Sequence, residues 1–108
     1  MPRLIPAADE LRRILSSSFA SFGARADVEE IASCRWASIT FSGERHLIRL
    51  RIDGAEAEAA ADAFLDGLAE REFELRGHIV ADVALVSDER EDGPVVRLGL
   101  EALTVEAG

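Results

Sequence analysis

The sequence predicts an α+β fold, a two-layer sandwich in which two helices cover one face of a four-stranded, mainly antiparallel sheet. Two stretches repeat apolar residues every three or four positions, which is typical of a helix with one buried face. Other stretches alternate apolar and polar residues, which indicates strands with one buried and one solvent-exposed face. The length of 108 residues suits one domain with a single core. The expected element order is α-β-β-α-β-β.

The first helix is predicted from Asp9 to Phe22. Its apolar residues lie on one helical face: Leu11, Ile14, Leu15, Phe19 and Phe22. Pro6 suits the first turn, and acidic residues at the start favour the positive end of the helix dipole. Gly23 can adopt the left-handed conformation that ends many helices.

A hairpin is expected next. Residues 24–33 show no clear period and are interpreted as a loop, whereas 34–41 are rich in β-branched and aromatic residues. The sequence Ser-Gly-Glu at 42–44 breaks this strand before a second one at 46–52. In the second strand one face carries His46, Ile48, Leu50 and Ile52.

The second helix is predicted to begin after a capping box formed by Asp53 and Glu56 and to end near Glu70. Its apolar stripe comprises Ala57, Ala60, Ala61, Phe64, Leu65 and Leu68. One strand is then expected over 72–86, with Phe73, Leu75, Gly77, Ile79, Ala81, Val83 and Leu85 facing inward. A charged turn at 88–93 precedes the last strand, 95–105, so the second pair of strands also forms a hairpin.

The chain reads as one domain, 1–108, and the element order also fits two α-β-β half-repeats, about 7–53 and 54–106. The best match aligns Leu47–Asp53 with Val95–Glu101. This match is short, and alternating strands resemble each other by chance, so duplication is a hypothesis.

Composition excludes several classes of protein. A chain that is 48% hydrophobic is too apolar to be disordered, and a net charge of −9 does not suit a general nucleic-acid binder. The acidity lies in the second half: residues 54–74 hold one arginine and seven acids, so a basic partner would meet that half first. The single cysteine, Cys34, allows no internal disulfide. With neither a signal-peptide pattern nor an apolar run of membrane-spanning length, we expect a soluble, cytoplasmic protein that does not enter membranes.

The solvent-exposed face of the sheet is the expected functional surface, because no helix would cover it. It is predicted to display arginines suited to carboxylate or phosphate contacts, together with acids, a histidine and an apolar residue. These candidate ligand or interface residues are Arg49, Arg51, Glu74, Arg76, His78, Asp82, Arg97 and Leu103. The plainest alternative is a solvated surface with cross-strand charge pairs of about 0.2–1 kcal/mol each.

Signatures of catalysis and of cofactors are missing from the sequence. His46 and His78 are the only histidines, and no Cys or His pair has metal-ligand spacing, so we expect neither a metal site nor a cofactor. His78 has acids near it but no recognisable nucleophile, so we predict no catalytic residues and favour a protein that is not an enzyme. The turn that starts at Asp88 begins like a calcium loop but has arginine at its third position.

Three functions remain open. The first is a non-catalytic interaction module that forms a homodimer through the open sheet face or an edge strand. The second is a module or enzyme that binds a small anionic compound at Arg49, Arg51, Arg76 and His78.

The third function is the binding of a basic or extended polypeptide. The element order resembles that of the specialised secretion chaperones, which are dimers that wrap an extended partner segment. The resemblance covers the order of elements only, and those chaperones have an additional strand and a C-terminal helix that we do not predict in this chain.

Overall fold

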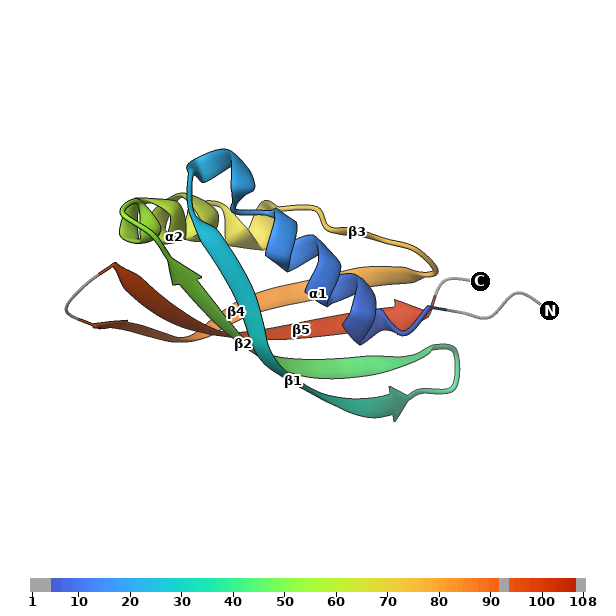
Figure 1. The fold of residues 1–108 in the computed structure, drawn as a ribbon. Helices are drawn as coiled ribbons and strands as arrows, with labels where there is room; N and C mark the ends of the chain where they lie inside the picture. Colours follow the sequence, from blue (N-terminus) through green and yellow to red (C-terminus); the bar gives the residue numbers. More distant parts are fainter. Residues whose placement is uncertain (1–4, 92–93, 107–108) are drawn as a thin grey trace.

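The computed structural model describes residues 5–91 and 94–106, which have an α+β fold with two α-helices and an antiparallel, curled sheet (Figure 1). Asp92 and Gly93, which belong to the charged turn expected at 88–93, lie outside the described residues. Two short 3-10 helices, η1 and η2, accompany the α-helices. The elements in chain order are α1 Ala7–Ser17, η1 Ala20–Phe22, β1 Arg25–Ala37, β2 Ser42–Asp53, α2 Ala57–Leu65, η2 Leu68–Glu70, β3 Glu74–Leu75, β4 His78–Glu91 and β5 Val95–Glu106.

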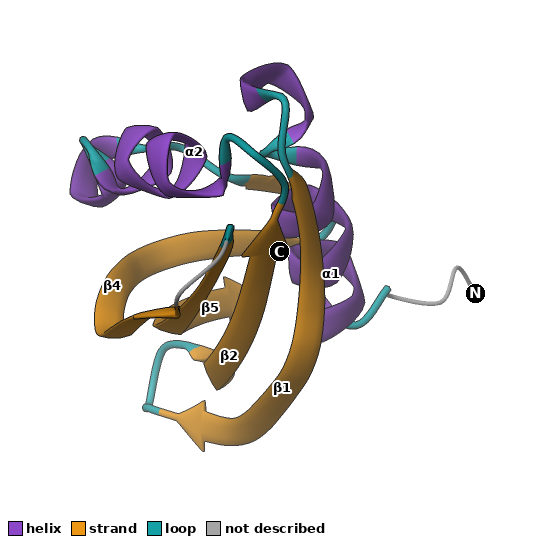
Figure 2. Cartoon of the chain, turned by 60° about the vertical axis from the view of Figure 1, so that its left-hand side comes forward, coloured by secondary structure: helices purple, strands orange, loops and turns teal. Residues whose placement is uncertain are grey.

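The described strands form one sheet of five strands in the order β1-β2-β5-β4-β3, so the expected number of four was wrong. All neighbouring strands are antiparallel, and the two hairpins meet where β2 pairs with β5. The long strands bend strongly, as Figure 2 shows. The molecule is elongated along them, with extents of 47 × 25 × 23 Å.

The fifth strand arises from a tight turn that the alternating pattern concealed. Leu75 pairs with His78, so Arg76 and Gly77 alone connect β3 to β4. Gly77 has φ of 81°, a left-handed conformation that side chains other than glycine rarely adopt. The single strand expected at 72–86 is therefore divided into two. Phe73 and Leu75 face the core as predicted, whereas the faces assigned to His78, Ile79 and Val80, after the turn, are reversed.

Two bulges shift the phase of β4 again. The register slips between Val80 and Asp82 and between Leu85 and Ser87. Each bulge inserts one residue, so the strict period of two fails across it. Ile79 and Val80 precede both bulges, so the turn alone exposes Ile79 and directs Val80 to the core. The first bulge then returns Val83 to the core, as predicted.

The first hairpin also differs from the prediction. β1 begins at Arg25, so most of the segment expected to be a loop is strand. Ala26 and Val28 are buried in it, but a bulge between Val28 and Glu30 hides the alternation. The turn lies at 38–41 instead of 42–44, where the Ser38 amide donates to the Phe41 carbonyl at 2.7 Å.

The helices occur near the predicted places but are shorter. α1 ends at Ser17 and η1 follows, with Gly23 in the left-handed conformation expected of it, at φ 72°. α2 ends at Leu65 because Gly67, at φ 73°, turns the chain into η2. The capping box is absent: Glu56 occupies the N-cap without a side-chain hydrogen bond.

One hydrophobic cluster joins both helices to the sheet. It takes alternate residues of β2 and β5, namely Ile48, Leu50, Ile52, Val96, Leu98, Leu100 and Ala102. Phe19, which follows α1, and Phe64 of α2 meet there with ring centroids 4.7 Å apart. The intervening residues of β2 and β5 point away from this cluster, and we call the surface that they form with their cross-strand neighbours the outer face.

Candidate functional site

The outer face is the surface on which the sequence placed its candidate residues, and it has two ends of different chemistry. Across β1, β2, β5 and β4, residues that pair directly form rows, because paired side chains point to the same side. One row contains Glu30, Arg49, Gly99 and Ser87. A row at the other end contains Trp36, Gly43, Val105 and Ile79.

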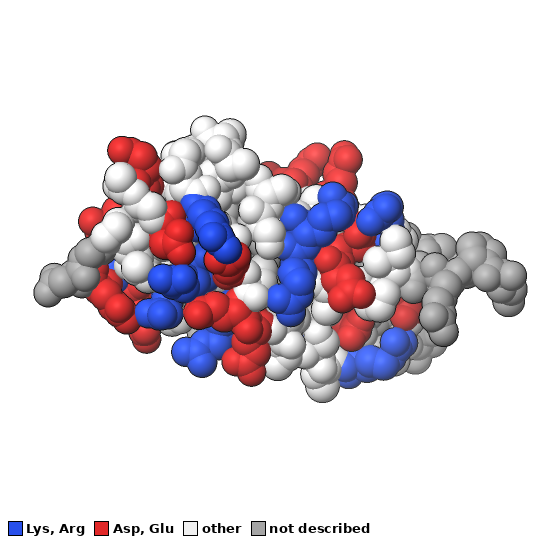
Figure 3. All heavy atoms as spheres, viewed as in Figure 1, with Lys and Arg blue, Asp and Glu red and all other residues white. Residues whose placement is uncertain are grey.

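Three of the candidates form the arginine end, which comprises Arg49, Arg51 and Arg97. Each guanidinium already has an acidic partner: Arg97 lies 2.7 Å from Glu91 and 3.4 Å from Glu29, and Arg51 lies 3.1 Å from Asp53. The Arg49–Glu30 pair is looser, at 4.0 Å. Positive and negative side chains alternate in the same way on the side of the molecule seen in Figure 3. Exposed pairs of this kind contribute about 0.2–1 kcal/mol each to the stability of a protein. Their main effect is therefore on the charge distribution of the surface.

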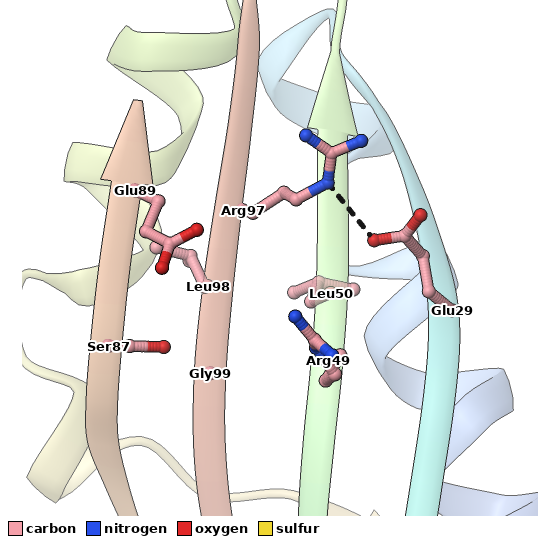
Figure 4. A pocket seen from close by; sticks show the side chains of 8 residues that line it. All are labelled: Glu29, Arg49, Leu50, Ser87, Glu89, Arg97, Leu98 and Gly99. Carbon is pink, nitrogen blue, oxygen red and sulfur yellow. Dashed lines mark hydrogen bonds and ion pairs between the residues drawn. The ribbon is translucent and has the colours of Figure 1, made fainter. Parts of the chain in front are cut away.

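A small hollow lies at the centre of the arginine end, over Gly99 (Figure 4). Its volume is about 30 Å³, enough for one water molecule, and a second hollow of about 240 Å³ adjoins it beside Leu47 and Val86. Arg49 and Arg97 reach the first hollow, but Glu29 and Glu89 line it as well. These two carboxylates oppose an anionic ligand, so the geometry gives little support to the small-anion hypothesis.

Arg76 and His78 do not belong to the outer face, which corrects their sequence assignment. The turn at 76–77 directs Arg76 toward α1 and His78 toward the residues that precede α1. His78 is buried, and its Nε2 lies 2.7 Å from the carbonyl oxygen of Ile5. The cluster expected of Arg49, Arg51, Arg76 and His78 is therefore not formed.

Arg76 instead holds a buried acid. The carboxylate of Glu10 in α1 accepts hydrogen bonds from the Arg76 amide at 2.8 Å and from its guanidinium at 2.9 Å. Arg13 adds a weaker pair at 3.2 Å. These donors, Arg76 first, hold the pKa of Glu10 well below its usual range. The arrangement attaches α1 to the β3–β4 turn, which is a structural role.

The three other candidates are separate from the arginines. Asp82 pairs with Leu103 across β4 and β5 on the outer face, and Glu74 is exposed on β3. None of the three touches the Gly99 hollow.

His46 forms a polar contact within the core. Its Nδ1 lies 2.7 Å from the Ser33 hydroxyl of β1 and its Nε2 lies 2.9 Å from the Thr104 hydroxyl of β5. Burial lowers the pKa of His46, which favours the neutral imidazole. The alternation of β2 predicted its inward direction, but nothing in the sequence identified its two partners.

Sequence reasoning identified Leu103 as an interface candidate but missed the larger apolar end of the outer face to which it belongs. We define this apolar end as Ile39 and Phe41 in the β1–β2 turn, with Trp36, Leu47, Ile79, Leu103 and Val105 on the strands. Ile39 is fully exposed, and Phe41, Leu47 and Ile79 have exposed fractions of 59%, 50% and 57%. The sequence predicts a strand over 34–41 that includes Ile39 and Phe41. Nothing in that pattern indicates that these two side chains lie in an exposed turn instead of the core.

The described residues contain no group of three or more His, Cys, Asp or Glu side chains that could hold a metal ion. No described helix has the length and hydropathy needed to span a lipid bilayer. Comparison with protein-family models, with curated proteins and with solved structures found no match to this chain.

Proposed function

We propose that this protein is a non-catalytic cytoplasmic interaction module that forms a homodimer through the apolar end of its outer face. In this proposal the helices form one layer and the sheet the other, so that the outer face is free to dock. The observation that carries the proposal is the exposure of Ile39, Phe41 and Ile79 at one end of the sheet, with Leu47 exposed further along the same face. A cluster of exposed apolar side chains is typical of an interaction surface.

A second copy of the chain suits this surface because most of the charges beside it, Asp82 excepted, are already balanced. Arg45 pairs with Glu101 at 3.3 Å, and Arg35 pairs with Glu106 at 3.1 Å. The excess negative charge lies elsewhere, above all in residues 54–74. A two-fold arrangement can therefore bury two apolar ends while it keeps the acidic regions of the two copies apart.

The test is the absolute mass by light scattering over an about hundredfold range of protein concentration, because dimers dissociate on dilution. We expect a species of twice the 11.7 kDa chain mass. The double variant Leu47→Glu/Leu103→Glu places two carboxylates in the interface, and we expect it to be a folded monomer. A wild-type protein that is monomeric at every concentration would refute the proposal.

A matched control is Leu85→Glu. Leu85 has an exposed fraction of 42%, comparable to the 50% of Leu47, but it lies on β4 beside η2, away from the apolar end. This variant is expected to remain dimeric. If it dissociated as readily as the double variant, the interface would not be the apolar end.

A further inference from the structure

A groove follows the outer edge of β4, on the side of the strand that faces away from β5. β3 pairs with β4 only at His78 and Ile79. Beyond Ile79 this edge faces the segment 65–73, and no backbone hydrogen bond joins the two among the described residues. The space between them has a volume of about 440 Å³ near η2 and about 640 Å³ near β3. We call it the β4-edge groove.

The edge of β4 is thus a row of backbone donors and acceptors without strand partners. The segment 65–73 forms a wall beside this edge. Such an edge can accept an added strand, with main-chain hydrogen bonds providing affinity and side pockets providing specificity. The wall is largely apolar, since Leu65, Leu68, Val83 and Leu85 line it. The two bulges bound a regular stretch, Asp82–Leu85, that is about 13 Å long. An added strand would therefore be short.

The charges of the groove indicate what binds there. The acids that line it are Glu70, Glu72, Glu74 and Asp82. None of them forms an ion pair with another described residue. Arg71 also lines the groove, but its guanidinium donates to the carbonyls of Ala63 and Phe64 and forms no ion pair with these acids, so four carboxylates face one arginine.

The other free edge of the sheet, β1, has the opposite character. Its acids and arginines are all paired: Arg25 with Asp27, Glu29 with Arg97, Glu30 with Arg49 and Arg35 with Glu106. The bulge beside Glu29 also interrupts its pairing pattern. Unpaired negative charge and an open strand edge therefore coincide at β4 and not at β1.

We propose that the β4-edge groove binds an extended, basic segment of another protein, which adds to β4 as a short strand. Its apolar side chains would contact the wall beside Leu68 and Leu85, and its arginine or lysine side chains would meet Glu70 and Asp82. A second copy of this chain is a poor occupant because its net charge is −9. This partner surface adjoins the apolar end at Ile79, which lines the groove near β3.

The test measures binding of a fluorescent peptide of about eight residues that alternates valine and arginine, a length that covers the regular stretch with its flanks. We expect Glu70→Arg/Asp82→Arg to weaken binding at least about tenfold, because it replaces attraction by repulsion. The control Glu56→Arg/Glu89→Arg changes the net charge equally at two exposed acids outside the groove that form no ion pair with another described residue. It should retain most of the affinity.

Strand addition has its own control. The same peptide with alternate backbone nitrogens methylated keeps its charge but loses donors to the strand edge, and it should bind much more weakly. If the methylated and the unmethylated peptide bound equally well, the peptide would not add to β4 as a strand. If the control variant weakened binding as much as Glu70→Arg/Asp82→Arg does, the peptide would not bind in the β4-edge groove.

Amide hydrogen exchange of the unaltered protein provides a test that does not depend on whether a variant folds. The peptide should protect amides within Asp82–Leu85 and leave those of β1 unchanged. Protection confined to β1, or no binding by the wild-type protein, would contradict the proposal. The mass measurement for the dimer is independent, so either proposal can fail alone.

Discussion

His46 shows how a single buried residue couples strand pairing to pH. It connects β1 to β5 across β2 through hydroxyl groups on both sides. A neutral imidazole has one donor and one acceptor, and a hydroxyl can supply either, so both contacts are satisfied without charge. Protonation would place a cation in the core.

The stability of the protein should therefore fall as pH decreases through the usual histidine range. Burial lowers the pKa of His46 in the folded state below the ordinary value of 6.5. Below pH 6.5 the unfolded chain takes up a proton that the folded state resists, so the free energy of unfolding decreases. Urea unfolding of the wild type and of His46→Gln between pH 7.5 and 5.5 checks this. The wild type should lose more stability; parallel curves would contradict the argument.

Glu10 has a linkage of the same sign at lower pH: stability again falls as pH decreases, here because the fold stabilises the charged carboxylate. Its pKa is lowered in the folded state, chiefly by hydrogen bonds from Arg76, so its contribution is present above the ordinary value of 4.5. That contribution is lost as pH falls below 4.5 toward the folded-state pKa. Glu10→Gln should flatten the acid dependence of unfolding, whereas Glu72→Gln, an exposed acid without an ion pair among the described residues, should leave it nearly unchanged. A similar flattening by both would contradict the assignment.

At the scale of the element, two glycines allow neighbouring strands to approach closely. A side chain at Gly43 would meet the Thr104 carbonyl oxygen of β5, and one at Gly99 would meet the Ser87 hydroxyl of β4. Neither glycine has a positive φ, so the cost of substitution is steric. The backbone oxygen cannot move without the strand, whereas the hydroxyl can rotate.

Gly43→Ala is accordingly expected to cost about 1–3 kcal/mol, as overpacking does, and Gly99→Ala less than about 1 kcal/mol. Chemical denaturation of the two variants measures the difference. A larger loss for Gly99→Ala would mean that Ser87, not the Thr104 backbone, is the rigid neighbour.

β4 shows why an element can be predicted while its faces are not. Its residues alternate in the sequence, but the turn at 76–77 and two bulges each change which side chains point inward. Bulges depend on the neighbouring strand, so a single strand's sequence does not reveal them. β2 and β5 pair without interruption, and the faces predicted for them are correct.

For the whole molecule, the register of the central strands bears on the duplication hypothesis. Leu50 and Leu98 are equivalent in the proposed half-repeats, and they pair with each other where β2 meets β5. A two-fold axis between two half-repeats would produce this register, because a residue beside the axis pairs with its own equivalent. Duplication of 7–53 and 54–106 stays a prediction.

Both leucines are buried at this pair, so truncation of either should be costly. Leu50→Ala and Leu98→Ala are each expected to destabilise the protein by about 2–5 kcal/mol, through lost burial and the cavity left behind. Thermal and denaturant unfolding of the two variants tests this. A loss below about 1 kcal/mol for either would show that its surroundings collapse or were loosely packed.

The sequence by itself determined the α+β class, the two helices, the left-handed Gly23 and the inward faces of β2 and β5. These depend on local periodicity and on backbone preferences that a few neighbouring residues express. Only the tertiary structure decided the fifth strand, the burial of His78, the Glu10–Arg76 attachment, the exposed apolar end and the β4-edge groove. Each of these depends on which distant segments become neighbours, and a strand's pattern contains no information about its partner's bulges or about what leaves its edge open.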